Sequence, residues 1–203
     1  MPQTTSLTLG NTAEPQIDGR RQRSETSRKK ILRAMLDLIS AGDVDPNAEA
    51  VAAQAGLGLR TVFRHFENME TLYREINIAM TADLVPMAMQ PFRATQWRGM
   101  LEEMLDRRVR LFERMMPFKI AADVHRHKSP YLARQGVELV RAQRAVLERI
   151  IPEEERSDSD FIEALDLVLS FDTWRRLRKD QELTVAQARS TVNALVNALL
   201  KGH

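Results

Sequence analysis

Residues 51–66 read VAAQAGLGLRTVFRHF, and this stretch decides the fold of the chain. Glycine favours helix ends and tight turns, because without a Cβ atom it can adopt a left-handed backbone conformation. Gly56 therefore predicts the end of one short helix, and Gly58 predicts the cap of the next. Val62 and Phe66, spaced i and i+4, would point inward from that second helix. The pattern predicts two short helices joined by a tight turn.

The second of these helices would present a polar and basic face to the outside. The residues predicted to face outward near its N-terminal half are Leu59, Arg60, Thr61, Arg64 and His65. Two helices arranged in this way are typical of a helix-turn-helix, in which the second helix enters the major groove of DNA. Packed helices with a glycine turn also occur in proteins that bind no DNA, so the spacing by itself leaves both interpretations open.

A basic segment precedes this motif. Between Arg20 and Arg33 seven Lys or Arg residues stand against one acidic residue, Glu25. The whole chain has 30 Lys plus Arg against 28 Asp plus Glu, a net charge of only +2. Such a small net charge does not make a protein that binds polyanions in bulk, so any contact with nucleic acid must come from local charge of this kind.

The composition excludes several classes of protein. A length of 203 residues with 43% hydrophobic residues is enough for a core, and the absence of cysteine excludes disulfides, thiolate catalysis and zinc sites built on cysteine. Asp83, Pro86 and Pro91 interrupt the best candidate for a membrane span. The N-terminus lacks the apolar core of a signal peptide, so we expect a cytoplasmic protein. We find no phosphate-binding loop and expect no cofactor.

The remaining pattern predicts an all-α protein in three parts. We expect residues 1–20 to form a mobile N-terminal arm, residues 21–74 a helix-turn-helix domain with its motif at about 47–66, and residues 75–203 a larger helical bundle. The predicted helices run from about residue 24 to Gly42, over 47–55 and 59–66, from about residue 70, and over 96–116, 130–151, 160–179 and 184–200.

The motif closely resembles the N-terminal signature of the TetR family of transcriptional regulators. The residues in register are VA at 51–52, AGLG at 55–58, TVF at 61–63 and HF at 65–66, followed by ETL at 70–72. A weaker resemblance to the last helix pair of that family extends over 165–184. The chain departs from the signature at Gly58, Phe63 and Met69, where Ser, Tyr and Lys are usual. These departures remove contacts to phosphate and one helix cap.

The resemblance implies a sequence-specific regulator of transcription, a repressor released by a small apolar or amphipathic effector. Leu59, Arg60 and Arg64 would approach base edges, while Asn47, Thr61 and His65 would touch phosphates. The complete predicted set for double-stranded DNA adds Lys29, Lys30, Gly58 and Phe63. A homodimer would place two such surfaces on a pseudo-palindromic operator. The alternatives are a helical small-molecule-binding protein or dimeric interaction module that has lost or weakened DNA binding, and a helical enzyme with an apolar pocket. His65 lacks a partner for catalysis, so we predict no enzyme.

Seven of the ten methionines lie between Met80 and Met116. Thioethers adapt to varied shapes and could line an apolar cavity, although ordinary core packing explains them equally well one by one. The resemblance implies a ligand cavity in this part of the chain. The predicted lining residues are Met87, Trp97, Met100, Met104, Phe112, Met115, Phe118, Asp123, His125 and Trp174. His125 and His127 diverge on a helix, so we predict no metal site.

The stretch 161–177 is apolar nearly all round, which requires partners on more than one side, and 184–200 shows a seam with the spacing of a coiled coil. Burial inside one chain is one explanation. The resemblance implies the other, a four-helix interface between two copies. The residues predicted for that interface are Phe161, Leu165, Val168, Val185, Ala188, Val192, Leu195 and Leu199.

Overall fold

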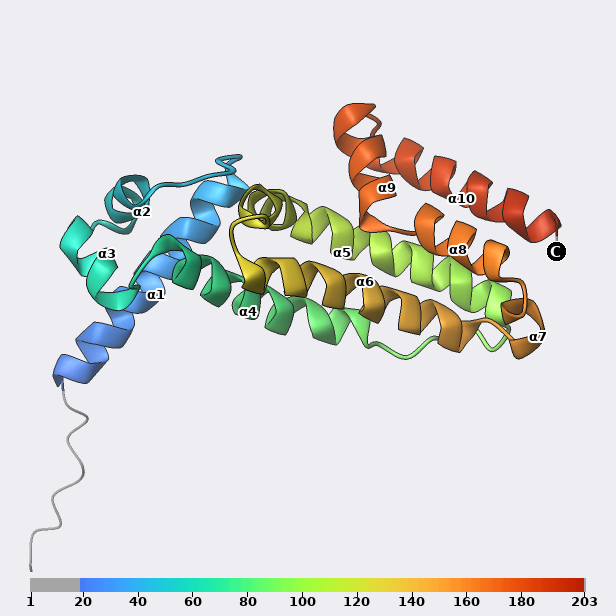
Figure 1. Ribbon diagram of the computed structural model, residues 1–203, viewed down its shortest axis with the longest axis horizontal. Helices are drawn as coiled ribbons and strands as arrows, with labels where there is room; N and C mark the ends of the chain where they lie inside the picture. The colour runs from blue at the N-terminus through green and yellow to red at the C-terminus, as the bar shows by residue number, and fades with distance from the viewer. Residues whose placement is uncertain (1–18, 203) are drawn as a thin grey trace, which may run out of the picture.

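The computed structural model describes residues 19–202, and all regular secondary structure in this range is helical. Ten α-helices and one π-helical turn follow one another along the chain (Figure 1). Their bounds are α1 Gly19–Ser40, α2 Ala48–Ala55, α3 Leu59–His65, α4 Met69–Ala88, α5 Trp97–His125, α6 Pro130–Ile150, α7 Glu153–Arg156, α8 Ser159–Val168, α9 Phe171–Arg175, η1 Arg176–Asp180 and α10 Val185–Lys201. The all-α prediction is confirmed.

The helices form two regions that meet end to end. Helices α1, α2 and α3 lie at one end of the molecule, and α4 leads from them into an elongated bundle (Figure 1). In the bundle, α5 lies between α4 and α6 on one side and α8 and α10 on the other (Figure 1). Helix α5 also contacts α1, so it links the bundle directly to the N-terminal helices.

Each region has its own apolar core. The first core joins α1 to α4 through residues such as Ile31, Met35, Val62 and Leu72, and it continues into the bundle at Ala121. The second core lies in the bundle, where α5 and α6 pack with α8, α9 and α10. Its members include Leu101, Phe112, Leu147, Leu165, Trp174 and Val192. Because the first core includes residues of α5 and α6, the N-terminal helices pack directly against the near end of the bundle.

Side-chain caps explain where several helices begin. The side chains of Asn47, Asn68, Ser129 and Asp158 each accept a hydrogen bond from a backbone N–H in the first turn of the helix that follows. Thr184 and Gln187 form a reciprocal capping box at the start of α10. Such caps satisfy N–H groups that a helix leaves unpaired.

Three predicted helix bounds are wrong. Helix α1 begins at Gly19, so Gly19 and Arg20 belong to it and not to an arm; the rest of the predicted arm lies outside the described residues. Helix α5 runs through Pro117 to His125, because packing against both cores outweighs the hydrogen bond that proline removes. The helix predicted over 160–179 is divided after Val168, because the side chain of Ser170 accepts a hydrogen bond from the Thr173 N–H and starts α9.

No helix among residues 19–202 has an apolar stretch long enough to cross a bilayer.

Candidate DNA-binding surface and ligand cavity

The turn between α2 and α3 has the geometry that the glycines predict. Gly56 ends α2 with a φ of 64°, and its N–H donates to carbonyl oxygens of the last turn of that helix. The N–H of Leu57 donates to the Ala52 carbonyl oxygen at 3.0 Å. Gly58 is the N-cap of α3 and supplies no side-chain hydrogen bond. Only a residue without a Cβ atom takes the Gly56 conformation without strain.

One face of α3 is held firmly in the first core. Val62 and Phe66 are each 1% exposed, and they pack in the same core as Ile31 and Met35 of α1. Leu57, in the turn, packs against this core as well. The inward-facing residues of the predicted helix-turn-helix are therefore confirmed, and the opposite face of α3 has a fixed direction in space.

The opposite face of α3 is open to solvent. Leu59 is 36% exposed and Phe63 is 46% exposed, and Arg60 and Arg64 are exposed beside them. Two guanidinium groups and two apolar side chains on a short rigid helix can reach both the polar edges of bases and the thymine methyl group in a major groove. Thr61 is half-buried.

Arg28, which the sequence did not single out, ties α1 to α3 and α4. Its guanidinium donates to the His65 carbonyl oxygen at 3.3 Å, pairs with Glu75 at 2.8 Å and lies 4.8 Å from the centre of the Phe66 ring. The neighbouring residues Lys29 and Lys30 are exposed and form no ion pair within residues 19–202. Arg28 is therefore structural, whereas these two lysines are free to contact phosphate.

Two predicted phosphate contacts are not freely exposed polar groups: Asn47 is engaged as a helix cap, and His65 is half-buried. The Asn47 side-chain oxygen accepts the Ala50 N–H at 2.8 Å and caps α2. His65 is half-buried, and its Nε2 atom is enclosed without a hydrogen-bond partner among the described residues. Burial lowers the pKa of His65, and the nearby charges of Arg64 and Arg28 lower it further. His65 is therefore neutral at neutral pH.

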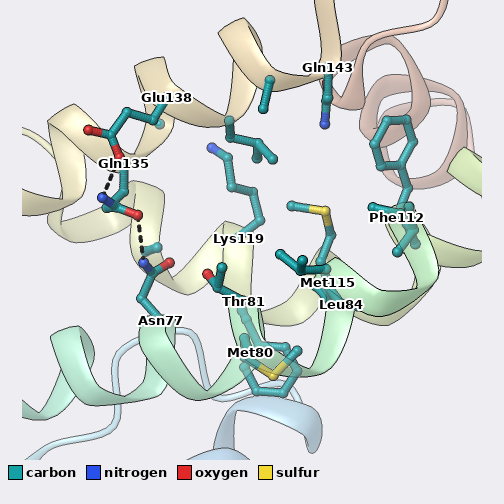
Figure 2. Close-up of a pocket in the computed structure, with 18 of the residues that line it drawn as sticks. Asn77, Met80, Thr81, Leu84, Phe112, Met115, Lys119, Gln135, Glu138 and Gln143 are labelled. Carbon is teal, nitrogen blue, oxygen red and sulfur yellow. Dashed lines mark hydrogen bonds between the residues drawn. The ribbon is translucent and has the colours of Figure 1, made fainter. Parts of the chain in front are cut away.

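A cavity of about 420 Å³ lies between α4, α5 and α6. Apolar side chains from all three helices form most of its wall, and Figure 2 shows Met80 and Leu84 of α4 and Phe112 and Met115 of α5 around it. Ile39, near the end of α1, also lines it. A volume of this order suits a small organic ligand.

Polar groups gather at the end of the cavity next to the N-terminal helices. The Asn77 amide donates to Gln135 Oε1 at 3.1 Å, and the Gln135 amide donates to Glu138 at 2.7 Å (Figure 2). The Lys119 ammonium binds both carboxylate oxygens of Asp123, at 2.5 and 2.7 Å. These polar groups therefore satisfy one another.

Two buried arginines line the other end of the cavity. Arg107 is 7% exposed; it donates to the carbonyl oxygens of Ala88 and Pro91, and its guanidinium lies 4.4 Å from the centre of the Phe92 ring. Arg108 is 5% exposed and donates to the carbonyl oxygens of Leu169 and Gln143 at 2.8 and 2.7 Å. Burial lowers the pKa of Arg108 to about 10, although Asp166 opposes this.

Half of the predicted ligand residues line the cavity. Those that line it are Met104, Phe112, Met115, Phe118 and Asp123. Those that lie elsewhere are Met87, Trp97, Met100, His125 and Trp174. Trp174 is buried in the second core, where its indole N–H donates to Glu113 at 2.8 Å, and His125 contacts the Tyr73 ring and Asp45. We therefore correct the prediction for all five residues, none of which lines the cavity.

The α6 wall of the cavity and the lining residues Asn77, Lys119, Arg107 and Arg108 were not predicted. Helix α6 is strongly amphipathic, with Leu139 and Val146 on the cavity side. That pattern is common to any bundle helix, so it predicts burial and not a cavity. Basic residues in the middle of an otherwise apolar helix face were the available signal, as at Arg107 and Arg108.

The residues predicted for a dimer interface divide into two groups. Phe161, Leu165, Ala188 and Val192 are buried within the single chain, so a second copy cannot reach them, and we correct that part of the prediction. Val185 and Leu195 are 37% and 44% exposed, and Val168 and Leu199 are half-buried. Leu167 of α8, which was not predicted, is 66% exposed.

Within residues 19–202 no group of three or more His, Asp or Glu side chains is arranged to hold a metal ion.

Two solved structures share this architecture. A transcriptional regulator from Rhodococcus sp. Rha1 aligns over 88% of this chain and 96% of its own, with a TM-score of 0.67 and 14% identity. A candidate TetR-family transcriptional regulator from Mesorhizobium loti MAFF303099 aligns over 88% of this chain and 97% of its own, with a TM-score of 0.54 and 19% identity. No family model and no curated protein matches the sequence. The chain therefore has the fold of these regulators.

Proposed function

We propose that this protein is a sequence-specific DNA-binding regulator of transcription. The observation that carries the proposal is the outer face of α3, where Arg60 and Arg64 are exposed on a helix whose other face is fixed by Val62 and Phe66. A helix held in this way can place two arginines against guanine edges without ordering its backbone at the moment of binding. Lys29 and Lys30 would add sequence-independent contacts to phosphate.

The proposed active form is a homodimer built on α8 and α10. These helices pack against each other, and Leu167, Val185 and Leu195 leave apolar surface exposed on them. Small residues such as Ala194 are exposed on the same helix as Leu195, which allows close approach of a second helix pair. Two copies would present two α3 helices to half-sites about 34–36 Å apart.

The proposed switch is an effector that binds in the cavity and releases the protein from its operator. Ile39 of α1 and Tyr73 and Ile76 of α4 border the cavity and also belong to the first core. A ligand that moves α4 would therefore change the packing of α1 and the separation of the two α3 helices. Such a ligand acts by preferring one of two conformers, so a repressor loses its operator when the effector is present.

The direct test uses variants of the α3 face. We expect the double variant Arg60→Ala/Arg64→Ala to lose specific binding to an operator duplex while it keeps its helical content and melting temperature. Arg141→Ala, at an exposed position of α6, is the matched control and should bind DNA as the wild type does. Equal binding by all three proteins would contradict the proposal.

A further inference from the structure

The charges around the cavity do not balance. Five charged side chains line it: Arg107, Arg108, Lys119, Asp123 and Glu138. Lys119 and Asp123 neutralise each other, and Glu138 is exposed and accepts a hydrogen bond from Gln135. Arg107 and Arg108 form no ion pair with any carboxylate in the described part of the chain; their partners are neutral carbonyl oxygens.

A buried cation with only neutral partners is costly, because carbonyl dipoles replace hydration but do not supply an opposite charge. Burial lowers the pKa of both arginines, which reflects that cost. Moreover, Arg107 Nε is buried without any hydrogen-bond partner among residues 19–202. Glu103 and Asp166 act on these two guanidinium groups through space, but no carboxylate in the described part of the chain is in direct contact with either.

The rest of the cavity is long and apolar. Its lining on α4 extends from Tyr73 to Ala88, which at 1.5 Å per residue is about 22 Å of helix. Between the two polar ends it is lined by residues such as Met80, Leu84 and Met115. At the far end, the side chains of Asn77, Gln135 and Glu138 already hydrogen-bond to one another, so they need no charged group of a ligand as a partner.

The cavity opens sideways between α4 and α6. The exposed residues on its wall are Thr81 and Val85 of α4, Met89 directly after it, and Glu138 and Ala142 of α6. An elongated molecule can therefore enter along its length without unfolding an end of the bundle.

We infer that the cavity binds a single-chain amphiphile with one carboxylate head, placed at the end lined by Arg107 and Arg108, and an apolar tail in the methionine-rich middle. The inference deepens the proposed function, since it names the class of effector. A carboxylate supplies a negative charge beside the guanidinium groups of Arg107 and Arg108, which both line this end, and the tail removes apolar wall from water.

The first test compares three single-chain probes of ten chain carbons each, the carboxylate carbon of decanoate included, on the unmodified protein: decanoate, decanol and decyltrimethylammonium, measured by calorimetry without DNA. We expect decanoate to bind about tenfold or more tightly than decanol, since a charge-assisted hydrogen bond is roughly twice as strong as a neutral one. The cation should bind weakest. Equal affinities, a preference for decanol or the cation, or no binding of decanoate would overturn the inference.

Variants then locate the head and the tail. We expect Arg107→Gln to reduce the affinity for decanoate to that for decanol and to leave decanol binding unchanged. Arg110→Gln, at an exposed position of the same helix, is the matched control. Met115→Trp, which fills the middle of the cavity, should abolish binding of both probes. An Arg107→Gln protein that folds and keeps the preference for decanoate would contradict the placement of the head.

These measurements are independent of the DNA-binding proposal. A protein that prefers decanoate but recognises no operator would keep this inference and overturn the proposed function. A protein that recognises an operator but shows no preference for decanoate would do the reverse.

Discussion

Individual cations on the N-terminal helices have distinct roles. Arg28 is engaged with Glu75, Phe66 and the His65 carbonyl, whereas Lys29 and Lys30 are free and Arg64 is exposed on α3. We expect Arg64→Ala to cost about 1–3 kcal/mol of specific DNA binding and to relax the sequence preference at one position. Lys29→Ala should instead weaken binding to all duplexes and flatten the dependence of affinity on salt.

Anisotropy titrations at several salt concentrations, on an operator and on a scrambled duplex, separate these two effects. The assignment fails if Lys29→Ala changes sequence preference, or if Arg64→Ala weakens both duplexes equally.

His65 should make stability depend on pH. Its pKa in the folded protein lies below the ordinary value of 6.5, because burial, Arg64 and Arg28 disfavour the charged ring. The unfolded chain therefore takes up the proton first as the pH falls, so stability present above about pH 6.5 is lost under more acid conditions. We expect His65→Gln to flatten the fall in melting temperature between about pH 7 and pH 5. The control is His127→Gln, at an exposed position, which should leave the fall in melting temperature as it is in the wild type.

At the scale of single elements, the two glycines of the α2–α3 turn should respond in opposite ways. Gly56 has a φ of 64° with open space around its missing Cβ, so Gly56→Ala should cost about 1 kcal/mol of stability through backbone strain alone. Gly58 also has open space and lies at an N-cap, so Gly58→Ser should stabilise the protein by a few tenths of a kcal/mol. Denaturant unfolding measures both; a neutral Gly56→Ala would show that the left-handed turn is not required.

The sequence predicted most helices because their ends have local signals. Gly56, Gly58 and Asn47 act on their own neighbours, so α2 and α3 were found almost to the residue. Pro117 is also a local signal, but it was misleading: whether a proline ends a helix depends on how tightly the flanking turns are packed, and α5 belongs to both cores. The division at Ser170 likewise depends on the preference of that side chain for the Thr173 N–H.

At the scale of the whole molecule, the cavity and the exposed C-terminal surface depend on distant contacts. The concentration of methionine and the family resemblance predicted Met104, Phe112 and Met115 as ligand residues. The sequence could not show which helices lie opposite them across the cavity. The same limit applies to α8 and α10: an apolar pattern predicts burial, and only the packed chain shows that Leu165 is covered by its own core while Leu195 is exposed.

The exposed C-terminal surface gives a prediction about assembly. Leu195→Arg would place a charge in the proposed dimer interface, which costs several kcal/mol when the group is buried without a partner. We expect this variant to sediment as a monomer and to lose cooperative binding to an inverted repeat. The control is Val137→Arg on α6, where the side chain is 42% exposed against 44% for Leu195; this variant should sediment and bind DNA as the wild type does. A Leu195→Arg protein that stays dimeric would place the interface elsewhere.

The most direct test of the central claim is selection of bound duplexes from a random DNA pool, carried out at two salt concentrations with the wild type and with Arg60→Ala/Arg64→Ala in parallel. We predict that the wild type enriches an inverted repeat with half-sites about one helical turn or a multiple of it apart, and that the double variant does not. Recovery of no motif by the wild type, with only weak binding that disappears at the higher salt, would contradict the claim. It would mean that the contacts missing at Phe63 and Met69 leave too little affinity for a DNA-reading regulator.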